Sequence, residues 1–138
     1  MRKYGDYEEF KKQLLYKRIV EWDKDKLVLD DGTIITIECS DSDCCAYAYG
    51  NFKDVKLDAV ITNVSDPIVK NIPDRDTNVN EAVITIYHNQ NPIALAECIA
   101  NAGNGGYYYS VGSFVIKDIH YKVVEAYWRK FKIILMNM

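Results

Sequence analysis

Two short segments of the chain carry side chains that can bind or react. The first, Ser42-Asp43-Cys44-Cys45-Ala46, sets two adjacent thiols beside a carboxylate. The second, Gly103-Asn104-Gly105-Gly106-Tyr107-Tyr108-Tyr109-Ser110, sets three tyrosines after a glycine-rich turn. Thiolates bind soft metals and attack electrophiles, whereas tyrosines stack on flat groups and form hydrogen bonds through their hydroxyls. Neither segment contains a complete catalytic constellation, so the sequence predicts binding rather than catalysis.

The cysteines and histidines are candidate zinc ligands, because thiolate and imidazole are the donors that zinc prefers. The residues concerned are Cys39, Cys44, Cys45, Cys98, His88 and His120. Structural zinc sites usually pair cysteines two to four residues apart, whereas adjacent cysteines on a strand point to opposite faces. We therefore expect the cysteines to be small buried residues, and we predict neither a metal nor a cofactor.

A nucleophilic role for Cys44 or Cys45 requires a neighbouring histidine or cation. The nearest charged residues are Asp41 and Asp43, whose negative charges oppose thiolate formation. The carboxylates of Asp74-Arg75-Asp76 lack the following ligands of a calcium loop. No enzymatic activity is predicted.

The glycine-tyrosine segment is a candidate ligand site, because glycines let a ligand approach the backbone and purine rings stack on tyrosine. It matches neither the phosphate loop nor the dinucleotide fingerprint. Two interpretations stay open. The glycines form a turn into an aromatic strand, with Tyr108 inward and Tyr107 and Tyr109 outward, or they line a site for a nucleotide-type ligand. The candidate contacts in the second case are Asn104, Gly105, Gly106, Tyr107, Tyr109 and Arg75.

Positive charge concentrates near the C-terminus, in Tyr127-Trp128-Arg129-Lys130-Phe131-Lys132. This cluster either grips phosphates or an acidic partner surface, or forms the solvated face of an amphipathic helix whose lysines cover apolar surface. The candidate partner-binding residues are Tyr127, Trp128, Arg129, Lys130 and Lys132.

The elements that position these segments are predicted to be mainly antiparallel strands. Asp6 is a candidate N-cap for a helix over residues 6–16. Strands over 18–22, 26–30 and 33–39 form a first meander, in which Asp31-Gly32 suits a tight turn. Beyond a strand over 59–64 and a polar loop over 66–76, a second meander is expected from strands over 81–87, 93–100 and 107–116.

The C-terminal residues follow a helical pattern. Apolar residues recur at four-three spacing, which predicts a C-terminal helix: Val124, Trp128, Phe131, Leu135 and Met138. This stripe either packs on the sheet or provides a subunit interface, so a homo-oligomer is possible. The predicted class is α+β, mainly antiparallel sheet, in a single domain over 1–138 with its core at 17–117, the helix at 6–16 and a C-terminal extension at 118–138.

Composition and charge set the function classes. The chain has 138 residues, 49% hydrophobic and 27% charged, which suits one folded domain. Its net charge of −3 disfavours generic nucleic-acid binding. The sequence contains no membrane-length apolar run and no signal-peptide pattern, so we expect no membrane association, a cytoplasmic location and free thiols.

Five segments carry a resemblance, over roughly residues 17–65 and 80–117: Arg18-Ile19-Val20, Leu29-Asp30-Asp31-Gly32-Thr33, Asp43-Cys44-Cys45-Ala46, Leu57-Asp58-Ala59-Val60-Ile61 and Gly106-Tyr107-Tyr108-Tyr109-Ser110. Together they resemble an uncharacterised family of small bacteriophage and prophage proteins. The resemblance implies an accessory protein acting in the host cytoplasm, with no assigned reaction and no catalytic residues. We expect a non-enzymatic protein that binds a host component, for example to counteract a host defence system. The alternatives are a small-molecule binding module that sequesters a nucleotide-type ligand, and a structural or virion-associated protein.

Overall fold

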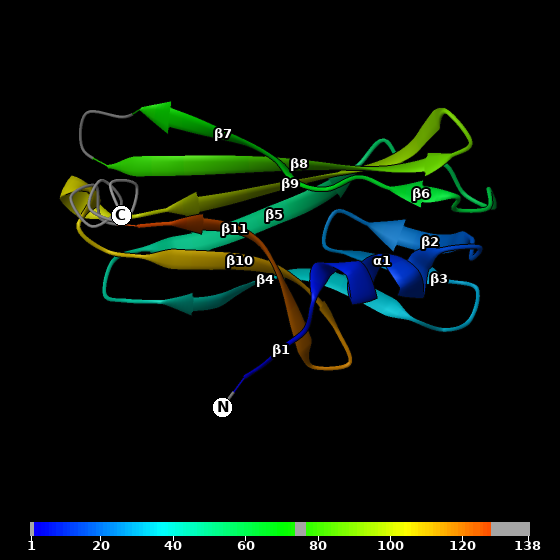
Figure 1. Ribbon diagram of the computed structural model, residues 1–138, viewed down its shortest axis with the longest axis horizontal. Coiled ribbons are helices and arrows are strands. Elements are labelled where there is room, and N and C mark those ends of the chain that lie inside the picture. The colour runs from blue at the N-terminus through cyan, green and yellow to red at the C-terminus, as the bar shows by residue number, and fades with distance from the viewer. Residues whose placement is uncertain (1, 74–76, 128–138) are drawn as a thin grey trace.

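The computed structural model describes residues 2–73 and 77–127, and these form two sheets that pack face to face (Figure 1). The elements, in chain order, are β1 (Lys3–Tyr4), α1 (Tyr7–Leu14), β2 (Ile19–Asp23), β3 (Lys26–Leu29), β4 (Ile34–Ser42), β5 (Tyr47–Lys53), β6 (Asn63–Val64), β7 (Ile68–Pro73), β8 (Asn78–His88), β9 (Asn91–Asn101), the 3-10 turn η1 (Asn104–Gly106), β10 (Ser110–Ile116) and β11 (Ile119–Ala126). One sheet has the order β1-β11-β10-β4-β3-β2 and the other β5-β9-β8-β6, with β7 also paired to β8. All pairings are antiparallel except that of β1 with β11.

The predicted N-terminal helix is confirmed as α1, with Asp6 as its N-cap. The Asp6 carboxylate accepts a hydrogen bond from the backbone N–H of Glu8 at 3.3 Å. Phe10 and Leu14, four residues apart, are the buried face of the helix. None of the described helices is long and apolar enough to cross a membrane.

The first meander is also confirmed, since β2, β3 and β4 are consecutive neighbours in one sheet. Gly32 closes the turn between β3 and β4 with a φ of +88°, a conformation that glycine adopts without strain. β4 runs to Ser42, three residues beyond its predicted end, and so reaches the cysteine segment.

The second meander is wrong in its last strand. β8 and β9 form the predicted hairpin, but β10 pairs with β4 and β11 in the opposite sheet. The chain between β9 and β10 therefore crosses from one sheet to the other. Because residues before Ser110 form this crossing, the strand starts at Ser110 rather than at the predicted Tyr107.

Two further segments differ from the prediction. The strand expected over 59–64 shrinks to β6 and an isolated bridge between Arg18 and Val60. The polar loop expected over 66–76 contains β7, which pairs with β8 from Ile68 to Pro73. The prolines that suggested a loop fall beside or at the end of this strand, and a strand with only one pairing partner tolerates proline.

The predicted C-terminal helix is not found in the described residues. Val124, the first member of the apolar stripe, lies in β11, while residues 128–138 lie outside the described part. A two-residue turn, Lys117-Asp118, folds β11 back along β10. β-branched Ile119, Val123 and Val124 suit this strand. The core consequently extends beyond the predicted limit at residue 117.

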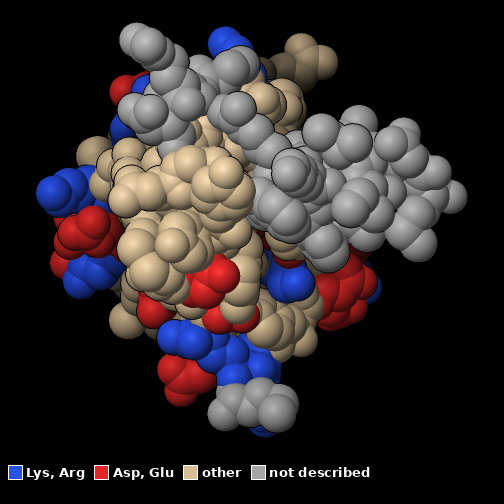
Figure 2. Space-filling model, turned by 90° about the vertical axis from the view of Figure 1, so that its left-hand side faces the viewer, with Lys and Arg blue, Asp and Glu red and all other residues tan. Residues whose placement is uncertain are grey.

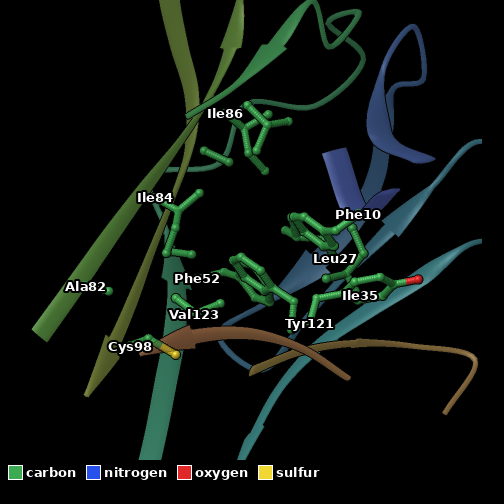
Figure 3. Packing of buried hydrophobic residues seen from close by; sticks show 14 of the residues in the cluster. Phe10, Leu27, Ile35, Phe52, Ala82, Ile84, Ile86, Cys98, Tyr121 and Val123 are labelled. Carbon is green, nitrogen blue, oxygen red and sulfur yellow. The ribbon is translucent and has the colours of Figure 1, made fainter. Parts of the chain in front are cut away.

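The core lies between the two sheets and is centred on stacked phenylalanines (Figure 3). The ring centroids of Phe10 and Phe114 are 4.5 Å apart with the rings nearly parallel, and those of Phe52 and Phe114 are 6.1 Å apart. Phe10 comes from α1, Phe114 from β10 and Phe52 from β5. This stack therefore joins the helix and both sheets.

Candidate functional site

The cysteine segment and the glycine-tyrosine segment meet at one end of the molecule. Residues 43–46 connect β4 to β5, and residues 102–109 connect β9 to β10, so both segments cross between the sheets. Both crossings lie at the left-hand end of the ribbon in Figure 1. We call the surface formed by residues 43–45, residues 104–109, Tyr47 and Tyr49 the crossover surface. Figure 2 faces this end, where the described residues near the centre are mostly uncharged.

Asp43 joins the two crossings directly. Its carboxylate accepts a hydrogen bond from the backbone N–H of Tyr109 at 2.7 Å. Its own backbone N–H donates to the carbonyl of Tyr109 at 3.1 Å. Two hydrogen bonds between the same two residues fix both the distance and the orientation of one loop relative to the other.

Asn101, at the end of β9, organises the second crossing. Its side-chain oxygen accepts from the backbone N–H of Gly103 at 2.7 Å and from the Thr77 hydroxyl at 3.0 Å. Its amide nitrogen donates to the Tyr47 hydroxyl at 3.3 Å, and its carbonyl accepts from the Ser110 hydroxyl at 2.9 Å. Through its side chain and its backbone carbonyl, the half-buried Asn101 thus holds the turn, the following strand and a neighbouring tyrosine together.

The glycines are required by the tyrosines of their own loop. Gly103 has a φ of +75°, and a Cβ placed on it would lie 2.8 Å from the Tyr108 ring and 2.9 Å from the carbonyl oxygen of Cys45. Gly105 has a φ of +72°, and the Tyr107 ring lies against it. The space that these glycines leave is therefore filled by Tyr107, Tyr108 and the cysteine segment.

Cys44 and Cys45 lie in a turn rather than on a strand, and both are exposed, contrary to the prediction of small buried residues. The φ of +30° at Cys44 breaks the alternation that would separate the two side chains. The interaction with the neighbouring Cys44 side chain raises the pKa of the Cys45 thiol and of the Tyr108 hydroxyl. Only Cys98 is buried, while Cys39 is half-buried.

The remaining candidate ligands do not converge. His88 makes a 2.7 Å hydrogen bond from Nδ1 to the carbonyl of Val60, and His120 is hydrogen-bonded to Ser40. Within residues 2–73 and 77–127, no group of three His, Cys, Asp or Glu side chains is arranged to hold a metal ion.

The tyrosines are the most exposed large side chains of the crossover surface. Tyr107 is 63% exposed, Tyr47 is 50% and Tyr49 is 48%. The rings of Tyr47 and Tyr49 are stacked, with centroids 5.9 Å apart. Tyr109 is half-buried and its hydroxyl is hydrogen-bonded to Asp41, which raises the pKa of Tyr109. Tyr107 is exposed as expected, whereas Tyr108 and Tyr109 are both half-buried rather than one inward and one outward.

The structure places most of the predicted ligand contacts at the crossover surface, and it describes one member of the predicted partner-binding set, Tyr127. Of the candidate ligand contacts, Asn104, Gly105 and Tyr107 are exposed on the crossover surface, Tyr109 is half-buried and Gly106 is buried. Arg75, Trp128, Arg129, Lys130 and Lys132 lie outside the described residues. Tyr127 is half-buried, and its carbonyl accepts from the Asn78 amide at 3.3 Å.

The sequence-based prediction omitted Tyr47, Tyr49 and the connecting roles of Asp43 and Asn101. The alternation of tyrosine with alanine and glycine over residues 47–50 is the available signal for the first pair, because residues two apart on a strand share a face. No local signal predicts the Asp43–Tyr109 pairing, since its partners are far apart in the sequence.

The exposure of the adjacent thiols predicts a graded reactivity. Iodoacetamide added to the native protein is expected to alkylate Cys44 and Cys45 well before Cys98, because burial blocks access to the Cys98 thiol and raises its pKa to about 12. Peptide mass spectrometry after timed quenching measures the order. Addition of urea serves as the control, since unfolding should make all four cysteines react at similar rates. Alkylation of native Cys98 as fast as Cys45 would contradict this placement.

Comparison with known proteins gives one match. A family model described as "Domain of unknown function (DUF7448)" matches residues 12–115. No curated protein and no solved structure matches the chain. The matched range contains both crossings, whereas Phe10 and β11, which complete the core, lie outside it.

Proposed function

We propose that this chain, which belongs to the DUF7448 family of unknown function, is a binding protein that recognises another protein through the crossover surface. The observation that carries the proposal is the exposure of Tyr47 and Tyr49 on β5 and of Tyr107 on the neighbouring crossing, in a region held together by hydrogen bonds. Membership of an uncharacterised family agrees with the resemblance drawn from the sequence. The bacteriophage origin stays a prediction.

Tyrosine is well suited to protein recognition. It offers a large, rigid contact area with a polar tip and has little rotational freedom to lose on binding. The loops add asparagine and glycine, the other residue types that enrich binding loops at the end of a β-sandwich. Because Asp43 and Asn101 already fix the loops, little ordering entropy remains to be lost in a complex.

A protein partner is favoured over a nucleotide at this surface for two reasons. The gaps beside Gly103 and Gly105 are occupied by the chain's own tyrosine rings. In addition, Asp41 and Asp43 place negative charge beside Tyr109, where a phosphate would be repelled. Sequestration of a nucleotide-type ligand remains the alternative prediction, with Arg75 as its candidate phosphate contact.

The resemblance to bacteriophage and prophage proteins supports a host protein as the partner. The same resemblance supports a non-enzymatic mode of action, because it implies no assigned reaction and no catalytic residues. Capture of a host protein that acts in defence against bacteriophages is the form of this function that we propose.

Affinity capture with matched tyrosine variants tests the proposal. The protein and its Tyr107→Ser and Tyr47→Ser variants are used as bait in lysate of the source cells, with quantitative mass spectrometry of the bound proteins. A partner of the crossover surface should be depleted about 30-fold by each variant, the equivalent of about 2 kcal/mol for a tyrosine at the centre of an interface.

Tyr16→Ser is the matched control, because Tyr16 is 78% exposed at the end of α1 and lies outside the crossover surface. The same substitution there should leave the partner's recovery unchanged. Equal depletion by Tyr16→Ser, or equal recovery with all three variants, would refute binding through the crossover surface.

A further inference from the structure

A concave site lies outside the crossover surface, between β1 and the turn that joins β10 to β11. Its volume is about 720 Å³, and it is lined by Arg2, Lys3, Lys117, Asp118, Ile119 and His120. This size is within the range of small-molecule sites. None of its lining residues belongs to the crossover surface.

The charge of this cavity is opposite in sign to that of the whole chain. Three cations face one carboxylate, whereas the chain carries a net charge of −3. Within residues 2–73 and 77–127, Arg2, Lys3 and Lys117 form no ion pair. Their charges are therefore available to an anion that enters the cavity.

His120 supplies an oriented ring nitrogen in the cavity wall. Its side chain is 8% exposed, and its Nδ1 lies 2.8 Å from the Ser40 hydroxyl, which donates to the Ser113 hydroxyl at 2.6 Å. When the proton of the neutral ring lies on Nδ1, the chain from His120 to Ser40 to Ser113 has one donor at each step, and Nε2 is a hydrogen-bond acceptor. In the described part of the chain, Nε2 of His120 makes no hydrogen bond. Every buried side-chain nitrogen there has a hydrogen-bond partner, so Nε2 is not one of the buried atoms. Nε2 is therefore accessible to solvent, and His120 is one of the residues that line the cavity.

The turn at the cavity rim has an unusual sequence for its geometry. Lys117 and Asp118 have φ values of +49° and +66°, the pattern of a two-residue turn that favours Asn-Gly. A lysine at the first of these positions is conformationally costly. Costly backbone conformations concentrate at functional sites, where a side chain is needed at that place.

We infer that this cavity binds a small anion of the phosphate class, held by the charges of Arg2, Lys3 and Lys117 and by a hydrogen bond that Nε2 of His120 accepts from a protonated phosphate oxygen. The ligand is either an inorganic phosphate or the phosphate group of a small metabolite. The inference does not depend on the proposed function of the crossover surface.

Titration with inorganic pyrophosphate, followed by NMR of the histidine ring signals, tests the inference. The chain has two histidines, so a His120→Gln variant assigns the signals. Pyrophosphate should shift the His120 signals saturably and leave those of His88 unchanged, with potassium chloride of equal ionic strength as the reference. A response no larger than that to potassium chloride would overturn the inference. A parallel titration with glucose 6-phosphate distinguishes the two sources: tighter binding of the sugar phosphate assigns a metabolite, and tighter binding of pyrophosphate assigns an inorganic anion.

Lys117→Asn separates binding from folding. Asparagine tolerates a positive φ, so the unfolding temperature should stay the same or rise, while pyrophosphate affinity should fall about tenfold with the loss of one charge-assisted contact. Lys24→Asn is the matched control, because it removes the same charge from the exposed β2–β3 turn. Affinity lost equally in both variants, or retained in Lys117→Asn, would contradict a specific site.

Discussion

Replacement of Phe114 by alanine is expected to lower the free energy of unfolding by about 3–5 kcal/mol. The Phe114 ring is buried between the rings of Phe10 and Phe52. Its removal leaves a cavity where α1 and the two sheets meet, and three different elements would have to move together to fill it. Because a domain of this size is stable by only about 5–15 kcal/mol, the substitution approaches the total stability of the fold.

Urea unfolding followed by circular dichroism measures this effect. Phe114→Leu keeps most of the apolar volume and should cost much less than the alanine variant. Ile34→Ala serves as a surface control, because Ile34 is 50% exposed, and should change the stability by less than about 0.5 kcal/mol. A loss below about 1.5 kcal/mol for Phe114→Ala would show that the stack does not support the packing of the two sheets.

Replacement of Gly103 by alanine should destabilise the protein by about 2–4 kcal/mol, through two separate costs. With a φ of +75° and a ψ of −169°, Gly103 lies in a region that only glycine occupies readily, and a residue with a Cβ costs about 1–3 kcal/mol there. The new Cβ would also press on the Tyr108 ring and on the carbonyl of Cys45. Since the carbonyl is backbone, the contact can be relieved only if the two crossings move apart.

Gly32→Ala is the control for a positive φ without a close contact. Gly32 has a similar φ of +88°, but nothing lies within 4 Å of the position its Cβ would take. Its loss of stability should therefore be about 1–2 kcal/mol. The excess of Gly103→Ala over Gly32→Ala, measured by the same urea unfolding, reports the contact between the two crossings. Equal losses would mean that the crossings are not in close contact.

Local sequence signals were sufficient for the elements that fold on themselves. The Asp6 cap predicts α1. The Asp31-Gly32 turn and the alternation of Ile35 with polar neighbours predict the β2–β3–β4 meander. Both the helix and the meander are present. In each case the determining residues lie within a few positions of each other.

Pairing between distant segments could not be predicted in this way. An aromatic strand after a glycine turn has the same local pattern whether it pairs with β9 or crosses to pair with β4. The predicted pairing of β10 with β9 was therefore wrong. Likewise, Val124 fits a helical repeat with later apolar residues, yet its pairing with Gly112 of β10 places it in a strand. The meeting of the two crossings depends on this same pairing, and for that reason the crossover surface emerged only from the fold.

Site-specific photo-crosslinking tests the central claim most directly. A photoreactive phenylalanine analogue replaces Tyr107 in one protein and Tyr16 in another, and both are irradiated in the source cells. If the crossover surface is the binding surface, the analogue at position 107 should form a discrete covalent adduct with one partner protein, and the analogue at position 16 should not. Adducts from position 16 alone, or the same adducts from both positions, would contradict the account.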